Sequence, residues 1–214
     1  MNKADLIPFI RQIINEASLP DDPFADEVDD TLLVFVRAAM TQLVSMPSYQ
    51  GTPSVLSDEA RVTFSARPDG LYYAVIKPGE DFLRPVGVNL EGWVRPVFDF
   101  QPATGTSFVR QYSSAPGIGS GPHSPSAFIT KDDQYLVIAH AVTEPKGYTL
   151  RYITIPDIAD DGTITIPERY REPLAYTAAG LYMQSINEYD VAKAAFDTAA
   201  SYIQTINNKT IDQQ

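Results

Sequence analysis

The sequence has no cysteine and only two histidines among its 214 residues. Without cysteine the chain has no disulfide bond, thiolate metal site, iron–sulfur cluster or cysteine nucleophile. Basic residues are also scarce, since 16 lysines and arginines stand against 27 acidic residues, which gives a net charge of -11. A protein that grips nucleic acid neutralises phosphates with a basic face, so this balance argues against a nucleic-acid binder.

Long hydrophobic runs are missing as well. The longest candidate, residues 31–36, ends at Arg37 and falls short of the ~18 apolar residues that a membrane helix needs. Residues 1–5 lack the pattern of a signal peptide. We therefore expect no membrane partner, and a protein that stays in the cytosol or is assembled there into something larger. The hydrophobic share of 44% is enough for one core, with or without an insertion.

The acidic charge is concentrated at the two ends of the sequence. Residues 1–60 hold 10 acids and 3 bases, a net of -7, and residues 156–214 hold 9 acids and 4 bases, a net of -5. Residues 61–155 hold 8 acids and 9 bases, a net of +1. The same two ends carry helical periodicity, whereas the middle holds most of the glycine and proline.

Two helices are predicted at each end of the chain. Near the start, isoleucines at three- and four-residue steps predict a helix that Asp5 caps, which would put Pro8 in the first turn. A second helix begins after Asp22 and ends near Met46. Its start is rich in acids that favour the positive end of the helix dipole. These acids, a candidate capping face or lumen-facing surface, are Asp22, Asp26, Glu27, Asp29 and Asp30.

Apolar stripes over residues 170–185 and 192–206 predict the closing helix pair, with a short connection at 187–190. Residues 207–214 are polar and are expected to form a frayed tail. The middle of the chain predicts short antiparallel strands near residues 61–65, 72–77, 93–100, 127–129, 135–139 and 148–153. The Gly/Pro/Ser-rich stretch 113–125 predicts a long loop.

The expected fold class is therefore α+β. Residues 1–49 and 167–214 together form one discontinuous domain, a four-helix bundle, because each helix has one apolar face. Residues 50–166 form a β-rich antiparallel insertion, with a flexible loop near 113–125.

No catalytic, cofactor-binding or metal-binding signature stands out. The stretch 157–163 resembles half of a calcium loop but lacks the closing glutamate, so a hairpin turn is the simpler interpretation. The glycines at 117–121 lack the lysine of a phosphate-binding loop. Two alternatives remain open: the tyrosine-rich insertion could bind carbohydrate or protein through aromatics such as Tyr72 and Trp93, or remote carboxylates such as Asp99 and Glu144 could serve a hydrolase.

Two segments carry a resemblance to a known family. Residues 26–39 form a helix with an acidic start and a large aliphatic stripe. Residues 166–182 contain the pattern Ile-Pro-x-x-Tyr and then Leu-x-Tyr-x-Ala-Ala, and the helix-forming residues 190–203 follow them. Together they resemble the head-to-tail connector proteins of tailed bacteriophages, also called adaptor or neck-ring proteins, and in particular a neck protein of the large gut phages that infect Bacteroides.

This resemblance implies a structural virion protein rather than an enzyme, at the neck between head and tail, assembled in the host cytoplasm. It implies a homo-oligomeric ring, commonly of twelve copies, that binds the portal and other neck or tail proteins. DNA would pass nearby without specific binding, and an acidic lumen would help it to slide. We expect the 113–125 loop and the C-terminal tail to contact partners, with these candidate residues: Pro116, Gly119, His123, Asn207, Lys209 and Ile211.

Overall fold

The computed structural model describes residues 1–14, 25–66, 72–104, 106–110, 123–132, 134–141 and 147–211. It mixes helices and strands, which confirms the α+β class. The chain divides into two compact units. We call Met1–Thr52 with Ile155–Gln214 the helical unit, and Pro53–Thr154 the β unit. The β unit is shorter at both ends than the 50–166 insertion expected from the sequence, because residues 50–52 and 155–166 group with the helices.

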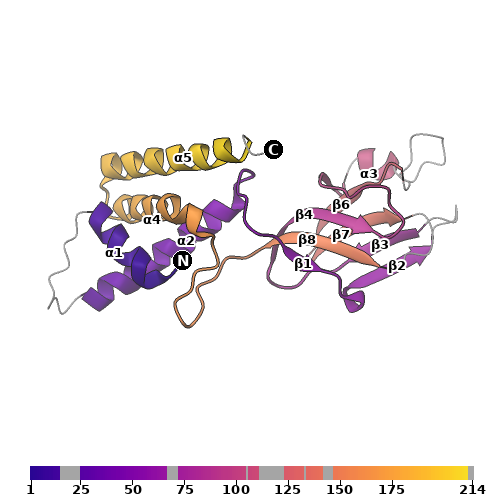
Figure 1. Cartoon of the computed structure of the whole chain (residues 1–214), viewed down its shortest axis with the longest axis horizontal. Coiled ribbons are helices and arrows are strands. Elements are labelled where there is room, and N and C mark those ends of the chain that lie inside the picture. Colours follow the sequence, from indigo (N-terminus) through magenta and orange to yellow (C-terminus); the bar gives the residue numbers. More distant parts are fainter. Residues whose placement is uncertain are drawn as a thin grey trace. The chain divides into compact units, whose positions relative to one another are not determined.

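One central helix organises the helical unit. Helix α4 packs against each of the other three, and Figure 1 shows it between α5 and the N-terminal helices. Because α4 is covered from several sides, it buries residues around most of its surface, from Pro173 to Met183. The regular four-helix bundle is not confirmed, since the packing converges on α4. The helices are α1 (Lys3–Ile13), α2 (Ala25–Ser45), α4 (Arg171–Ser185) and α5 (Tyr189–Ile211), with a 3-10 turn η2 (Glu168–Tyr170) before α4.

Helices α4 and α5 approach closely because small residues line their contact. A Cβ atom at Gly180 would lie 2.7 Å from the ring of Phe196. Ala192, Ala195 and Ala199 of α5 are buried. Glycine at position 180 leaves room for the Phe196 ring.

The start of α1 and the end of α5 correct the sequence-based predictions. Asn2 caps α1, since its side chain accepts a hydrogen bond from the Ala4 N–H at 2.9 Å. Asp5 therefore lies within the helix, and Pro8 lies beyond the first turn. At the other end of the chain, α5 continues to Ile211, so residues 207–211 are helical rather than frayed. Helix α2 ends at Ser45, close to the predicted end.

The β unit contains two sheets that share one core. The three-stranded sheet has the order β1-β8-β4, and the five-stranded sheet has the order β2-β3-β7-β6-β5. Buried side chains from both sheets, among them Ile76, Phe82 and Leu150, form a single cluster, which also includes Trp93 from the turn after β4. The strands are β1 (Ser54–Leu56), β2 (Val62–Ala66), β3 (Tyr72–Ile76), β4 (Phe82–Leu90), β5 (Phe100–Pro102), β6 (Ala127–Asp132), β7 (Gln134–Ala141) and β8 (Tyr148–Thr154); η1 (Glu59–Arg61) and α3 (Thr106–Arg110) complete the unit.

The strand predictions were wrong in several respects. The strand expected over 93–100 is absent from that described stretch, where Val97 forms only an isolated bridge to Val88 and β5 begins at Phe100. Strand β4 was missed because Pro85 lies inside it, where the register shifts relative to β8. Such an irregularity lets a sheet accept proline. The strands are also not all antiparallel, since β5 pairs with β6 in parallel.

Candidate interaction surfaces

A return segment, residues 155–166, leads from β8 back to the helical unit and binds both the N-terminus and α2. Ile164 N–H donates to the Met1 carbonyl at 2.9 Å, and Lys3 N–H donates to the Gly162 carbonyl at 2.9 Å. A Cβ atom at Gly162 would lie 2.9 Å from the Lys3 side chain, and its φ of +81° also favours glycine. The N-terminus is therefore anchored in the helical unit.

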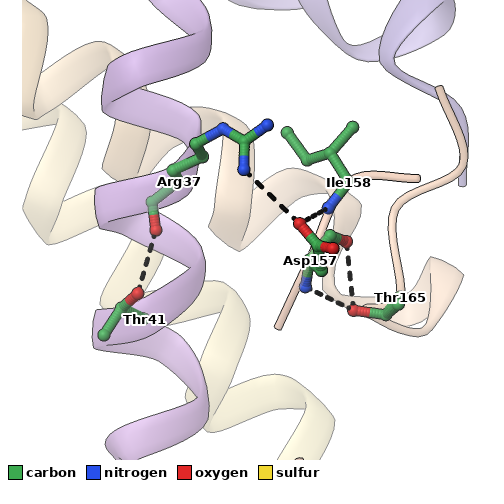
Figure 2. Close-up of polar contacts among 5 residues, drawn as sticks. All are labelled: Arg37, Thr41, Asp157, Ile158 and Thr165. Atoms are coloured by element: carbon green, nitrogen blue, oxygen red, sulfur yellow. Dashed lines mark hydrogen bonds and ion pairs between the residues drawn. The ribbon is translucent and has the colours of Figure 1, made fainter. Parts of the chain in front are cut away.

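On the other side of the return segment, Asp157 faces α2. Figure 2 shows Arg37 reaching from α2 toward Asp157, with Arg37 Nη1 at 3.4 Å from Asp157 Oδ1. The same carboxylate oxygen accepts the Ile158 N–H at 2.7 Å. The Thr165 hydroxyl donates to the Asp157 carbonyl at 3.2 Å and accepts the Asp157 N–H at 3.1 Å. Because both side chains are largely exposed, the Arg37–Asp157 ion pair contributes only about 0–1 kcal/mol to the free energy of unfolding. The backbone contacts therefore hold the segment in place.

Residues 157–163, which resemble half of a calcium loop in sequence, form a turn within this segment. Gly162 N–H donates to the Ala159 carbonyl at 2.8 Å, and Ile158 bridges Ile164. Asp161 accepts the Thr163 N–H at 2.8 Å, and this hydrogen bond lowers the pKa of the Asp161 carboxyl. Among the residues that the structure describes, no group of three or more histidine, aspartate or glutamate side chains could hold a metal ion.

The predicted acidic face of α2 has two different kinds of carboxylate. Asp29 Oδ1 accepts a hydrogen bond from Arg11 Nε at 2.9 Å and forms an ion pair with Arg11 Nη2 at 2.8 Å, so it joins α2 to α1. Asp30 is exposed. Asp26 and Glu27 lie in the first turn of α2, but their side chains are outside the described set, and so is all of Asp22.

The predicted partner contacts are not brought together by the described structure. His123 is exposed next to β6, whereas Pro116 and Gly119 lie outside the described residues. Asn207 lies in α5, and its side-chain oxygen is buried without a hydrogen-bond partner among the described residues. The backbones of Lys209 and Ile211 belong to the last turn of α5. Whether these residues contact partners stays a prediction.

The alternative functions receive little support from the described side chains. Trp93 is only 8% exposed and belongs to the core of the β unit, so its ring face is covered. Tyr72 is half-buried and packs against the same core. Asp99 is exposed, and Glu144 lies outside the described residues.

Exposed apolar side chains mark two surfaces that the sequence analysis missed. One is the corner between α4 and α5, where Ile186, Tyr189 and Val191 are exposed beside Glu188 and Asp190. The sequence signal for this surface was the presence of apolar residues at the connection between two predicted helices. The other is a cleft of about 200 Å³ in the β unit, lined by Phe98, Arg151 and residues of β4. A larger hollow of about 530 Å³ shares Pro96 and Phe98 with this cleft.

The family model described as SU10 adaptor protein matches residues 1–213. The chain belongs to the SU10 adaptor protein family. No curated protein matches the chain.

Membership in the SU10 adaptor family makes the chain a phage adaptor-type structural protein. This family implies a place in the virion and contacts with other virion proteins. It argues for a structural rather than a catalytic role. None of the helices in the described part of this adaptor-family chain has the length and apolar character to cross a membrane.

Proposed function

We propose that the chain is a head-to-tail connector that assembles into a ring beneath the portal and lines the DNA conduit. The family match over residues 1–213 supports this proposal most strongly. The ring would hold about twelve copies, would occupy the neck of the virion, and would assemble in the host cytoplasm. The sequence likeness to neck proteins suggests a large gut phage of Bacteroides as the source.

The charge distribution supports a position near DNA without specific binding to it. The helical unit holds 17 acids and 7 bases, a net of -10, whereas the β unit holds 10 acids and 9 bases, a net of -1. An acidic lumen repels the duplex and lets it slide. In this proposal the exposed acids of the helical unit, such as Asp30, face the conduit.

Partner contacts in the neck would come from the segment that holds Pro116, Gly119 and His123, and from the C-terminal part of α5. The exposed position of His123 supports the first of these contacts. The helical extension through Ile211 supports the second, because a helix end presents a defined surface to a portal or tail protein.

Co-purification tests the proposal. The tagged portal protein of the same phage is co-expressed with this chain, captured, and washed at increasing salt. We expect the chain to remain with the portal in a fixed ratio, and to show no binding to duplex DNA in a parallel gel-shift assay. A chain that elutes without the portal at every salt concentration would count against the connector role.

A further inference from the structure

The cleft of the β unit is built around an outward-facing aromatic ring. Phe98 is 63% exposed, and a Cβ atom at Gly87 would lie 2.9 Å from its ring. Glycine at this position of β4 therefore lets the ring lie against the sheet. The two hydrogen bonds between Val88 and Val97, each 2.8 Å, hold the Phe98 backbone in place. These contacts hold Phe98 against β4.

Cations border this ring. Arg151 lines the cleft, Arg95 and Asp99 line the larger hollow, and Phe98 lines both. Both arginines are exposed, and neither forms an ion pair with another side chain in the described parts of the chain. Val55, which pairs with Arg151 across the β1–β8 ladder, and Val94 add exposed apolar surface. The cleft therefore suits a ligand that is both apolar and acidic.

The corner between α4 and α5 has the opposite character. Tyr189 is 60% exposed, and Ile186 and Val191 are exposed next to it. Glu188 and Asp190 stand between these apolar residues and carry the only charges of residues 186–191. In the part of the chain that the structure describes, neither carboxylate forms an ion pair.

The corner is also held in a fixed shape. Asn187 adopts a φ of 66°, in the left-handed region. Glu188 N–H donates to the Met183 carbonyl at 2.9 Å, and Ala192 N–H donates to the Glu188 carbonyl at 3.0 Å. The Tyr189 hydroxyl donates to Asn187 Oδ1 at 3.0 Å. A preformed protrusion loses little conformational entropy when it binds.

We infer that the α4–α5 corner of one copy docks into the Phe98 cleft of an adjacent copy. Tyr189 would lie against Phe98, and Glu188 and Asp190 would face Arg151 and Arg95. Tyrosine and arginine, with tryptophan, are enriched among the residues that contribute most of the binding energy at interfaces. The inference rests on the proposed ring, and it names the surfaces that join its subunits. Because the two surfaces differ, the contact is heterologous and can close into a ring.

Complementation between two variants tests this contact. The cleft variant is Phe98→Glu and the corner variant is Tyr189→Glu. Because both positions are exposed, we expect both variants to keep the fold, and circular dichroism checks this. Each variant alone should self-associate roughly tenfold or more weakly than the wild type, as expected for the loss of an aromatic anchor. In a mixture, the Phe98→Glu chain keeps an intact corner and the Tyr189→Glu chain keeps an intact cleft. The corner of the first can dock into the cleft of the second, so the mixture should form one-to-one heterodimers and nothing larger. Sedimentation velocity distinguishes these species.

A charge exchange gives a second readout. Arg151→Glu alone should weaken self-association, and adding Glu188→Arg in the same chain should restore at least part of it. Lys77→Glu and Asp197→Arg change charge at exposed positions outside the two surfaces and should have no effect.

The outcomes separate this inference from the proposed function. If both variants assemble like the wild type, or if their mixture stays monomeric while the wild type assembles, the proposed contact is wrong and the connector role stands. If the wild type stays monomeric at every concentration, the contact between copies is also wrong. The connector role is then decided by portal co-purification alone.

Discussion

Arg11 binds one carboxylate oxygen of Asp29 through two nitrogens, Nε at 2.9 Å and Nη2 at 2.8 Å. Arg11 is only 6% exposed, so its charge depends on partners within the protein. The pair joins α1 to α2 and assigns a structural role to one acid of the predicted acidic face. A carboxylate that neutralises a buried guanidinium contributes less to an acidic surface than a free one.

Replacement of Asp29 should therefore destabilise the fold. Asp29→Ala leaves the buried Arg11 without this partner, and we expect a loss of about 1–3 kcal/mol in the free energy of unfolding. Urea denaturation measures it. Asp30→Ala is the matched control, because this neighbour is exposed, and it should stay within about 0.5 kcal/mol of the wild type. Equal effects at the two positions would contradict the structural role of Asp29.

Gly180 should resist substitution although it lies inside a helix. Alanine favours a helix over glycine by about 1 kcal/mol, yet a Cβ atom here would lie 2.7 Å from the Phe196 ring. We expect Gly180→Ala to destabilise by about 1–3 kcal/mol, as overpacked cores do. The double variant Gly180→Ala/Phe196→Leu should recover part of that loss. A stabilising Gly180→Ala would show that α5 yields to the added methyl group.

Asn2, rather than Asp5, should be the residue whose loss weakens α1. Asn2→Ala removes the hydrogen bond to the Ala4 N–H, and such a cap contributes about 1 kcal/mol. Asp5→Asn keeps the size of the side chain and leaves the cap intact, so it should cost less. Thermal unfolding of the two variants makes the comparison. A larger effect at Asp5 would favour the cap that the sequence suggested.

Tyr148 should make stability fall at high pH. Burial and the nearby Asp58 charge raise the pKa of Tyr148 from 10.0 to about 12. A raised folded-state pKa gives stability that is complete below pH 10 and is lost as the pH rises through about 12. Tyr152 acts in the same direction, because burial and its hydrogen bond to Asp81 raise its pKa.

Urea titrations at pH 8 and pH 11 test this dependence. Tyr148→Phe should lose about 1 kcal/mol at pH 8, where the hydroxyl donates to the Asp58 carbonyl at 2.8 Å. Between the two pH values it should lose less stability than the wild type. An equal pH-dependent loss in both proteins would exclude Tyr148 as the titrating group.

The helices were largely predictable because their signals are local. The aliphatic stripe of α2 repeats at helical spacing and stops next to Pro47, and the observed helix ends at Ser45. The end of α5 was not predictable in the same way. Its last residues are polar, but Ile206 and Asn207 are partly buried, and helical structure continues into the polar stretch.

The strands and the candidate surfaces depend on contacts between distant residues, which the sequence does not display. Strand β4 tolerates Pro85 only because its register shifts against β8. Phe98 faces outward only because the bridge to Val88 turns Val97 inward. The apolar character of the α4–α5 corner can be seen in the sequence, but its exposure cannot.

Electron cryomicroscopy of the neck of the intact virion tests the connector role most directly. We predict a closed ring of this chain in contact with the portal, with the helical unit of every subunit recognisable in the density. A neck that contains no copy of the chain, or a chain found only elsewhere in the particle, would contradict the account.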